Sequence, residues 1–460
     1  MKKELCLSIL YLHSVVTGSN KLKIESDEGS NIVSSFGGSG KKQFLDTSYL
    51  DLLNAAEVEI QLEEGRVSLF NTVPGMPQME GFFYGQNEQQ SANLYKDPES
   101  GIVFGSIVDS EKNEISQITT NSIGETEVIT KSVDDFTDED ESLKVPESKV
   151  AFFGARNLRQ SPRSLNDVNV IDVMVLWTRK AECSTSGLYV NCALTDQTRK
   201  NMFAKIHLAV DETNIAFALS GINAQLRLVH AYLEDSYKET TSSDALQDLT
   251  FQYDGNMDDV HDKRKKFGAD VVSFLIHSAT GCGLGWVGPH KDYMFSVVNE
   301  ACATGYFSFG HELAHNIGCN HDRGSENDCA SMAPNFGYRD PNGQFRDIMS
   351  YNCQSRQCDN VASGTCTRVQ RFSNTASNYD GAPIGNQQCD CASHINARVS
   401  TVAGYQDYKT DEQLVELGQF EFEGDPPTPS PTRKNCKPRN KTCGSNSSCC
   451  SGECTWRRCQ

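Results

Sequence analysis

The sequence predicts a chain of three parts whose central part is an α/β domain with a mostly parallel, twisted sheet. The first observation is that patterned segments between residues 171 and 277 follow the order strand, helix, strand, helix, strand. The second is that six of the 18 cysteines fall between Cys436 and Cys459, whereas none lies between Cys6 and Cys183. The third is an acidic stretch before the α/β pattern. These observations predict a β-rich N-terminal segment, the α/β domain and a small disulfide-rich module.

Residues 1–18 have the pattern of a secretory signal peptide. Lys2 and Lys3 precede the apolar run LCLSILYLHSVV, and small residues follow it. The alternative is the short amphipathic start of a cytosolic protein, against which the many cysteines argue. No apolar stretch reaches the roughly 18 residues that a membrane-spanning helix needs. We therefore expect a secreted, extracellular protein without a transmembrane segment.

The next segment is acidic but not wholly disordered. Residues 19–163 hold 25 acidic and 13 basic residues, and they contain no cysteine and no histidine. Residues 57–69 and 101–108 alternate between apolar and polar side chains, which predicts strands. The run Arg156-Asn157-Leu158-Arg159 ends this segment with the R-x-x-R pattern that a furin-like convertase cuts, although such runs are frequent.

The α/β domain is predicted from five segments. Strands alternate with longer segments of helical period, so right-handed crossovers would give a mostly parallel sheet. The expected elements are a strand at 171–178, a helix at 201–220, a strand at 224–232, a helical pattern at 244–267 and a strand at 269–277.

The run HELAHNIGCNHD from His311 to Asp322 predicts a metal site. His311 and His315 are four residues apart, so on a helix their rings share one face and can bind one zinc at about 2.0–2.1 Å. Gly318 can adopt a positive φ and end the helix, which allows His321 to supply a third ligand. Three imidazoles leave one coordination position open, as in catalytic zinc sites. Glu312 lies beside His311 and is placed to take a proton from water.

This motif resembles that of the metzincin zinc metalloproteases. Asp347-Ile348-Met349-Ser350-Tyr351 follows at the distance where metzincins have a tight turn, whose methionine packs under the metal without binding it. Asp322 resembles the acidic residue after the third histidine in the reprolysin (adamalysin) branch, where it braces the site. The runs CGLGW and FSVV before the zinc helix are most similar to the peptidyl-Asp metalloendopeptidases of bacteria. The resemblance covers about residues 168–408, and we expect the domain at 160–408.

The resemblance implies a zinc endopeptidase with Glu312 as general base and with protein or peptide substrates. Tyr351 either approaches the metal and the reacting carbonyl or is an ordinary packed tyrosine. In the family an edge strand pairs with the substrate; the candidate is Phe295, Ser296, Val297 and Val298, which could instead form a core strand. The peptidyl-Asp type hints at acidic residues near the scissile bond, and Arg339 and Arg346 are candidates to bind them. Calcium occurs in this clan, but no dedicated calcium loop is visible. We expect no nucleic-acid partner.

In front of a protease, the acidic residues 19–159 suggest a propeptide that keeps the enzyme latent. Many metzincins use a propeptide cysteine as a fourth zinc ligand. The absence of cysteine and histidine from residues 19–163 excludes such a thiolate or an imidazole. An Asp or Glu carboxylate is our hypothesis, with simple blockage of the cleft as the alternative.

The cysteines of the α/β domain are odd in number. Eleven lie between Cys183 and Cys391, so one should be free or paired elsewhere. Cys183–Cys192 and Cys282–Cys302 are plausible bridges, but sequence does not fix the connectivity.

The C-terminal part reads as a linker, 409–432, with four prolines in the run PPTPSP, and a basic module, 433–460. Six cysteines so close together need disulfides to hold a fold, and their spacing resembles that of inhibitor cystine knots. That resemblance implies the pairs Cys436–Cys450, Cys443–Cys454 and Cys449–Cys459; another small disulfide scaffold is the alternative.

Residues 432–460 carry seven basic residues and one acid, so the module could bind an anionic surface, a glycan or a receptor, or simply be solvated. Asn440 and Asn446 lie in glycosylation sequons. The rival reading of the whole chain is a toxin-like binding protein whose tail is the active part.

Overall fold

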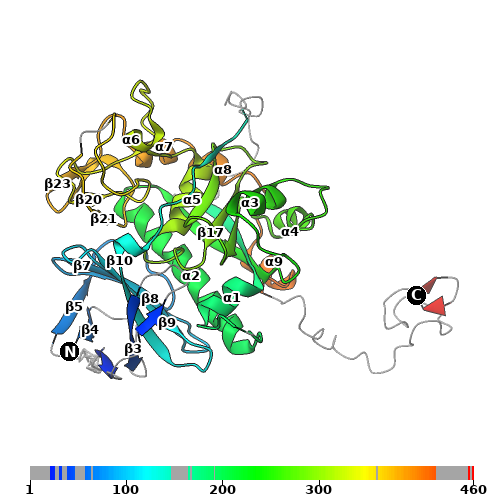
Figure 1. Cartoon of the computed structure of the whole chain (residues 1–460). Coiled ribbons are helices and arrows are strands. Elements are labelled where there is room, and N and C mark those ends of the chain that lie inside the picture. Colours follow the sequence, from blue (N-terminus) through cyan, green and yellow to red (C-terminus); the bar gives the residue numbers. More distant parts are fainter. Residues whose placement is uncertain are drawn as a thin grey trace, which may run out of the picture. The chain divides into compact units, whose positions relative to one another are not determined.

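The structure is a computed structural model (Figure 1) that describes residues 57–146 and 168–420, apart from 64–65, 191 and 359–360. Outside these ranges it describes only short backbone strands. Two compact units are present, Met1–Gln419 and Phe420–Gln460. The predicted signal peptide, the R-x-x-R run at Arg159 and four of the six tail cysteines lie outside the described residues.

The N-terminal segment forms a large sheet, as its alternating pattern predicts. β1 pairs with both β4 and β3, which closes the sheet. Ten apolar side chains from seven of its strands, β4 to β10, form a core inside it, among them Phe70, Phe83 and Leu94. The strands are β1 (Lys21–Glu25), β2 (Asn31–Val33), β3 (Ser39–Asp46), β4 (Glu57–Glu63), β5 (Arg66–Thr72), β6 (Phe82–Gln86), β7 (Gln90–Lys96), β8 (Val103–Asp109), β9 (Glu114–Thr120) and β10 (Thr126–Ser132).

The α/β part contains the predicted, mostly parallel sheet. The strands β13 (Val168–Trp177), β14 (Ala224–Leu233), β15 (Val271–Ile276) and β17 (Phe295–Asn299) run parallel. β16 (Gly283–Val287) is antiparallel to β17, and the short β12 (Ser164–Leu165) is antiparallel to β13. β15 and β17 are buried along their whole length, as expected for parallel strands covered on both faces.

Helices connect these strands, and one predicted helical segment is divided in two. The helical pattern at 244–267 forms two helices, α3 (Ser242–Thr250) and α4 (Val260–Phe267). Between them Tyr253, Gly255 and Met257 adopt positive φ, so the chain turns within the segment of helical pattern. The other helices before the metal motif are α1 (Arg179–Thr185) and α2 (Asp196–Leu219). In the described ranges, no helix is both long and apolar enough to cross a membrane.

The long helix α2 is shared between the two sheets. One side faces β14, whose Leu226 backbone exchanges hydrogen bonds with Asn214. Its other side packs Ala204, Leu208 and Ile215 against aromatic residues of the N-terminal sheet. Figure 1 shows the strands of that sheet against α2. The N-terminal segment is therefore packed into the same unit as the α/β part.

From Asn320 onward the chain forms short elements. They are β18 (Asn320–Asp322), α6 (Arg323–Glu326), β19 (Phe336–Gly337), β20 (Phe345–Arg346), β21 (Thr367–Arg368), β22 (Asn374–Tyr379), β23 (Ala382–Ile384), α7 (Cys391–Asn396), α8 (Val399–Val402) and α9 (Asp411–Glu416).

The predicted domain end at residue 408 is too early. Helix α9 begins with a capping box in which Thr410 and Gln413 exchange hydrogen bonds. Its Leu414 is buried in the main core of the α/β part, so residues 409–419 belong to this unit and not to the linker. The acidic composition of this segment gives no sign in the sequence that Leu414 is buried.

The second unit contains one described hairpin, β24 (Cys454–Thr455) with β25 (Arg458–Cys459), in which Cys454 faces Cys459 in the register. The cystine-knot-like pairing of the tail remains a prediction, because it falls outside the described side chains.

Candidate metal centre and cleft

The metal motif forms a helix that ends where predicted. His311 and His315 lie on α5 (Ser308–Ile317), and Gly318 ends it with φ +106°. A Cβ at Gly318 would lie 2.8 Å from Nε2 of His394, so this position needs glycine for its conformation and for its space. The reversal leads into β18, which brings His321 back toward the helix.

The three histidines converge on one point. Their nearest ligand atoms all lie within 4.8 Å of one another, and the Nε2 atoms of His315 and His321 are 3.0 Å apart. All three side chains are buried. Nε2 of His311 has no hydrogen-bond partner among the described residues. A buried nitrogen without a partner is costly unless a metal completes it, so the donor set fits zinc.

Each ring is oriented by its other nitrogen. Nδ1 of His311 donates to the Ile348 carbonyl and Nδ1 of His315 to the Cys319 carbonyl, both at 2.7 Å. Nδ1 of His321 lies 3.1 Å from the Glu326 carboxylate. Because these partners only accept, Nδ1 carries the proton and the Nε2 lone pair faces the centre.

Burial keeps two of these imidazoles neutral. It lowers the pKa of His311 to about 3, although Glu139 raises it in part. Burial also holds the pKa of His315 well below its usual range, with the other two histidines adding to the effect. A neutral imidazole need not release a proton before it binds a cation, so the site is prepared for metal near neutral pH.

Glu312 lies beside this centre. Both of its carboxylate oxygens are buried, and neither has a hydrogen-bond partner in the described ranges. Burial raises the pKa of Glu312 well above its usual range, and Glu139 and Asp140 raise it further. The carboxylate lies against Gly283 and Gly285 of β16, where a Cβ would come within 2.5 Å and 2.9 Å of its oxygens. An unpartnered carboxylate next to a metal site is suited to accept a proton.

Asp322 and the turn at Met349 contact residues that surround the metal centre. Asp322 caps α6 through Ser325 and accepts from the backbone N–H of Tyr351. It also pairs with the buried Arg339 at 2.9 Å. Met349 is fully buried and follows Ile348, whose carbonyl orients His311. Arg339, a sequence candidate for binding acidic substrates, is thus committed to Asp322.

Tyr351 contacts the centre and the N-terminal segment. Its ring lies 4.3 Å from the His321 ring, centroid to centroid. Its hydroxyl donates to the Glu139 carbonyl at 2.9 Å and approaches that of Asp140 at 3.4 Å. Burial and the nearby carboxylates raise the pKa of Tyr351, so it is a neutral donor.

The predicted substrate strand is not an edge strand, in line with the alternative of a core strand. Phe295 to Val298 belong to β17, which lies between β15 and β16 in the interior of the sheet. On this side of the sheet the outer strand of the α/β part is β16. Its sequence, GLGWV, contains two glycines and has weak strand propensity. For this reason the sequence pattern does not predict β16 as a strand.

The outer edge of β16 is occupied by residues 138–145 of the N-terminal segment. β11 (Leu143–Lys144) pairs in parallel with Trp286 and Val287. Upstream, the Asp138 carbonyl accepts from the Cys282 N–H at 3.2 Å, and the Asp140 N–H donates to the Gly283 carbonyl at 2.9 Å. The carbonyls of Glu139 and Asp140 also lie within reach of the hydroxyl of Tyr351, whose ring packs against His321.

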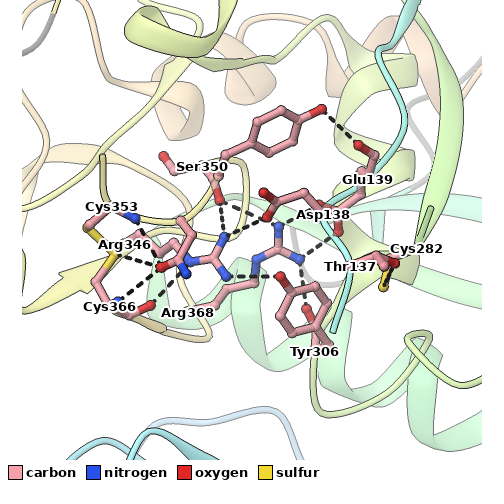
Figure 2. A network of polar contacts seen from close by, with 12 residues as sticks. Thr137, Asp138, Glu139, Cys282, Tyr306, Arg346, Ser350, Cys353, Cys366 and Arg368 are labelled. Atoms are coloured by element: carbon pink, nitrogen blue, oxygen red, sulfur yellow. Dashed lines mark hydrogen bonds and ion pairs between the residues drawn. A yellow bond between two sulfur atoms is a disulfide. The ribbon is translucent and has the colours of Figure 1, made fainter. Parts of the chain in front are cut away.

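A buried network near the metal centre joins Glu139 to residues that the sequence did not single out (Figure 2). Arg368 forms a two-bonded ion pair with Glu139, and Ser308 donates to the same carboxylate. Arg346, the other sequence candidate, lies next to them and donates to Tyr306 and to the Ser350 carbonyl. No local pattern marks Glu139 or Arg368, because they are 229 residues apart.

Four disulfides form in the α/β part. The expected bridges Cys183–Cys192 and Cys282–Cys302 are both present, and Cys329–Cys358 and Cys353–Cys366 accompany them. Among the described residues Cys319 and Cys391 are free and buried, whereas the odd number of cysteines predicts one that is free or paired elsewhere.

Comparison with known proteins assigns the α/β part. Residues 178–397 match metallo-peptidase family M12. A peptidyl-Asp metalloendopeptidase of Xanthomonas campestris pv. campestris is 34% identical over 188 residues, 40% of this chain and 42% of that protein. One of Stenotrophomonas maltophilia strain R551-3 is 35% identical over 192 residues, 40% and 43% of the two chains. One of Pseudomonas aeruginosa is 26% identical over 248 residues, which are 49% of this chain and 38% of that protein.

These matches span less than half of the length of each relative. Among solved structures, metalloproteinase-II of Bacteroides fragilis gives a TM-score of 0.30 at 11% identity, over 58% of this chain and 81% of that chain. The matched segment includes the three histidines, Glu312 and the turn at Met349. Residues 178–397 therefore belong to metallo-peptidase family M12.

Proposed function

We propose that this chain is a secreted zinc endopeptidase that is synthesised in a latent form. The observation that carries the proposal is the convergence of His311, His315 and His321 beside the unpartnered carboxylate of Glu312. Four disulfides support secretion, because such bridges persist in oxidising compartments.

Zinc bound by the three imidazoles would polarise the scissile carbonyl and lower the pKa of the attacking water. Glu312 takes the proton of that water and passes it to the leaving amine. Its raised pKa suits both steps, since the group must accept a proton and then donate it. Tyr351, whose hydroxyl reaches a backbone carbonyl in the cleft, can donate to the oxyanion of a substrate.

Residues 138–145 would account for latency by blocking access of a substrate to the metal centre. Residues 138–145 occupy the edge of β16, and the Glu139 carbonyl engages Tyr351. The metal-binding group found among the described residues consists of the three histidines alone, so blockage explains latency without a carboxylate ligand. Activation would then require a cut near Arg159, by a furin-like convertase, and departure of the segment. The relatives' name suggests that the released enzyme cuts beside acidic residues.

The test is proteolysis of an unfolded protein by the full chain, before and after cleavage and removal of the N-terminal segment. We expect cleavage only by the processed form, loss of activity with a zinc chelator, and recovery when zinc is restored. Mass spectrometry of the products reports the preferred residues. Chelator-resistant cleavage, or no cleavage by a folded, zinc-loaded and processed sample, would contradict the proposal.

Replacing Gly283 with alanine should disturb Glu312 without removing it. A Cβ at residue 283 would lie 2.5 Å from Oε1 and 2.7 Å from Cγ of Glu312, so the carboxylate must move. A displacement of this size is expected to lower kcat by about 100-fold. The measurement is kcat together with zinc content, which should not change. Gly364→Ala is the matched control, because its Cβ would meet nothing within 4 Å. Equal kcat values for the two variants would show that the position of Glu312 is not critical.

A further inference from the structure

We propose that Arg368 binds the acidic side chain of the substrate, and that Glu139 occupies this place in the uncleaved chain as a substrate mimic. This inference rests on the proposed function and deepens it. It concerns a group of residues that we call the Arg368 cluster, namely Arg368, Tyr306 and Ser308.

The Arg368–Glu139 pair has the geometry of carboxylate recognition. Nη1 lies 2.6 Å from Oε1 and Nη2 lies 2.7 Å from Oε2, so both carboxylate oxygens are bound at once. Both side chains have no exposed surface. Burial alone would raise the pKa of Glu139, but Arg368 outweighs it and holds that pKa well below its usual range. A planar, two-bonded guanidinium pair selects a carboxylate over a neutral amide.

The cluster is built entirely by the α/β part. Arg368 is placed by β21, its Nη1 also donates to the Tyr306 carbonyl, and its guanidinium lies 4.2 Å from the centre of the Tyr306 ring. Ser308 supplies the other donor to Glu139, at 2.8 Å. Loss of the N-terminal segment would therefore remove the acid and leave all of its donors in place.

Once Glu139 leaves, Arg368 lacks an ionic partner. Among the described residues, Glu139 is the only carboxylate that forms an ion pair with Arg368. A buried guanidinium without a counter-charge is strongly unfavourable. A ligand that brings a carboxylate to this place relieves that cost, whereas the corresponding amide does not. The released enzyme thus has a built-in preference for an acidic residue.

The cluster is connected to the metal centre through helix α5 and through Tyr351. Ser308 is the first residue of α5, one turn before His311. Glu139 has its carboxylate in the cluster, while its carbonyl accepts from Tyr351, whose ring lies against His321. One residue of the N-terminal segment therefore contacts both the Arg368 cluster and Tyr351, which packs against His321.

The first experiment compares kcat/KM for two peptides that differ only by Asp or Asn beside the cut, using enzyme freed of the N-terminal segment. Arg368→Met is expected to lower the Asp-to-Asn ratio by roughly 100-fold while zinc stays bound. Arg371→Met is the control, because Arg371 donates to the Leu219 carbonyl away from the cleft. An unchanged ratio in an active Arg368→Met enzyme would reduce the pair to a structural role. Failure of the proposed function looks different, since the wild type would then cut neither peptide.

The second experiment needs no Arg368 variant and so does not depend on its folding. A synthetic peptide spanning residues 134–145 should inhibit the released wild-type enzyme, and Glu139→Gln in that peptide should raise its inhibition constant at least about 10-fold. Asp138→Asn is the matched control, because this carboxylate is partly exposed and lies 3.6 Å from Arg346. Equal effects of the two changes, or none from Glu139→Gln, would overturn the mimicry.

Discussion

Replacing Glu312 with glutamine is expected to lower kcat by about 10²–10⁴-fold, the usual contribution of a general base. The amide keeps the shape of the side chain but cannot take a proton from water. The Glu312 carboxylate makes no hydrogen bond in the described structure, so the change breaks no hydrogen bond of the fold. The measurement is kcat on a peptide at saturating zinc, with the bound zinc counted in the same sample.

The control for this variant is Glu326→Gln. Glu326 contacts Nδ1 of His321 and not the reacting groups, so its replacement should weaken zinc affinity by about 10–100-fold and leave kcat nearly unchanged once zinc is saturating. A Glu312→Gln enzyme with wild-type kcat would exclude Glu312 as the base. A loss of zinc from Glu312→Gln would instead mean that the carboxylate supports the metal.

Replacing Asp322 with alanine is expected to lower the free energy of unfolding by about 3–5 kcal/mol. Asp322 caps α6, fixes the backbone of Tyr351 and neutralises Arg339, whose side chain is fully buried. Its removal takes away the carboxylate that lies 2.9 Å from that buried guanidinium. The measurement is urea unfolding in the presence of a chelator, so that a change in zinc affinity does not contribute.

The comparison is Asp235→Ala, which breaks the pair with Arg179. Both of those side chains are about half exposed, so we expect a loss of about 0–1 kcal/mol. If the two variants lose the same stability, Asp322 does not brace the site through its ion pair.

The metal centre could be predicted because its determinants are local. His315 follows His311 by four positions, and one glycine with positive φ returns the chain to His321. Backbone geometry alone therefore brings the three rings together. The parallel strands could be predicted for a similar reason, since β15 and β17 are apolar runs of strand length.

The surroundings of the metal centre could not be predicted, because residues far apart in the sequence meet there only in the folded chain. Its outer strand, β16, is rich in glycine and has no alternating pattern, so the more apolar β17 was chosen instead. Glu139 is one acid in a dense acidic run, and Arg368 is one of several scattered arginines. Nothing in either neighbourhood reveals that the two side chains form a buried pair.

The packing of α2 makes cleavage of the chain and dissociation of the N-terminal fragment two separate steps. Ala204, Leu208 and Ile215 share an apolar core with Tyr84, Phe104 and other residues of the N-terminal sheet. Hydrolysis of a bond near Arg159 changes none of these contacts, and separation would expose the apolar surface on both sides. We therefore expect the two fragments to remain associated after the first cut. The lifetime of that complex, rather than the rate of the first cut, would then determine how long the enzyme stays inactive. Further digestion of the N-terminal fragment would set that lifetime.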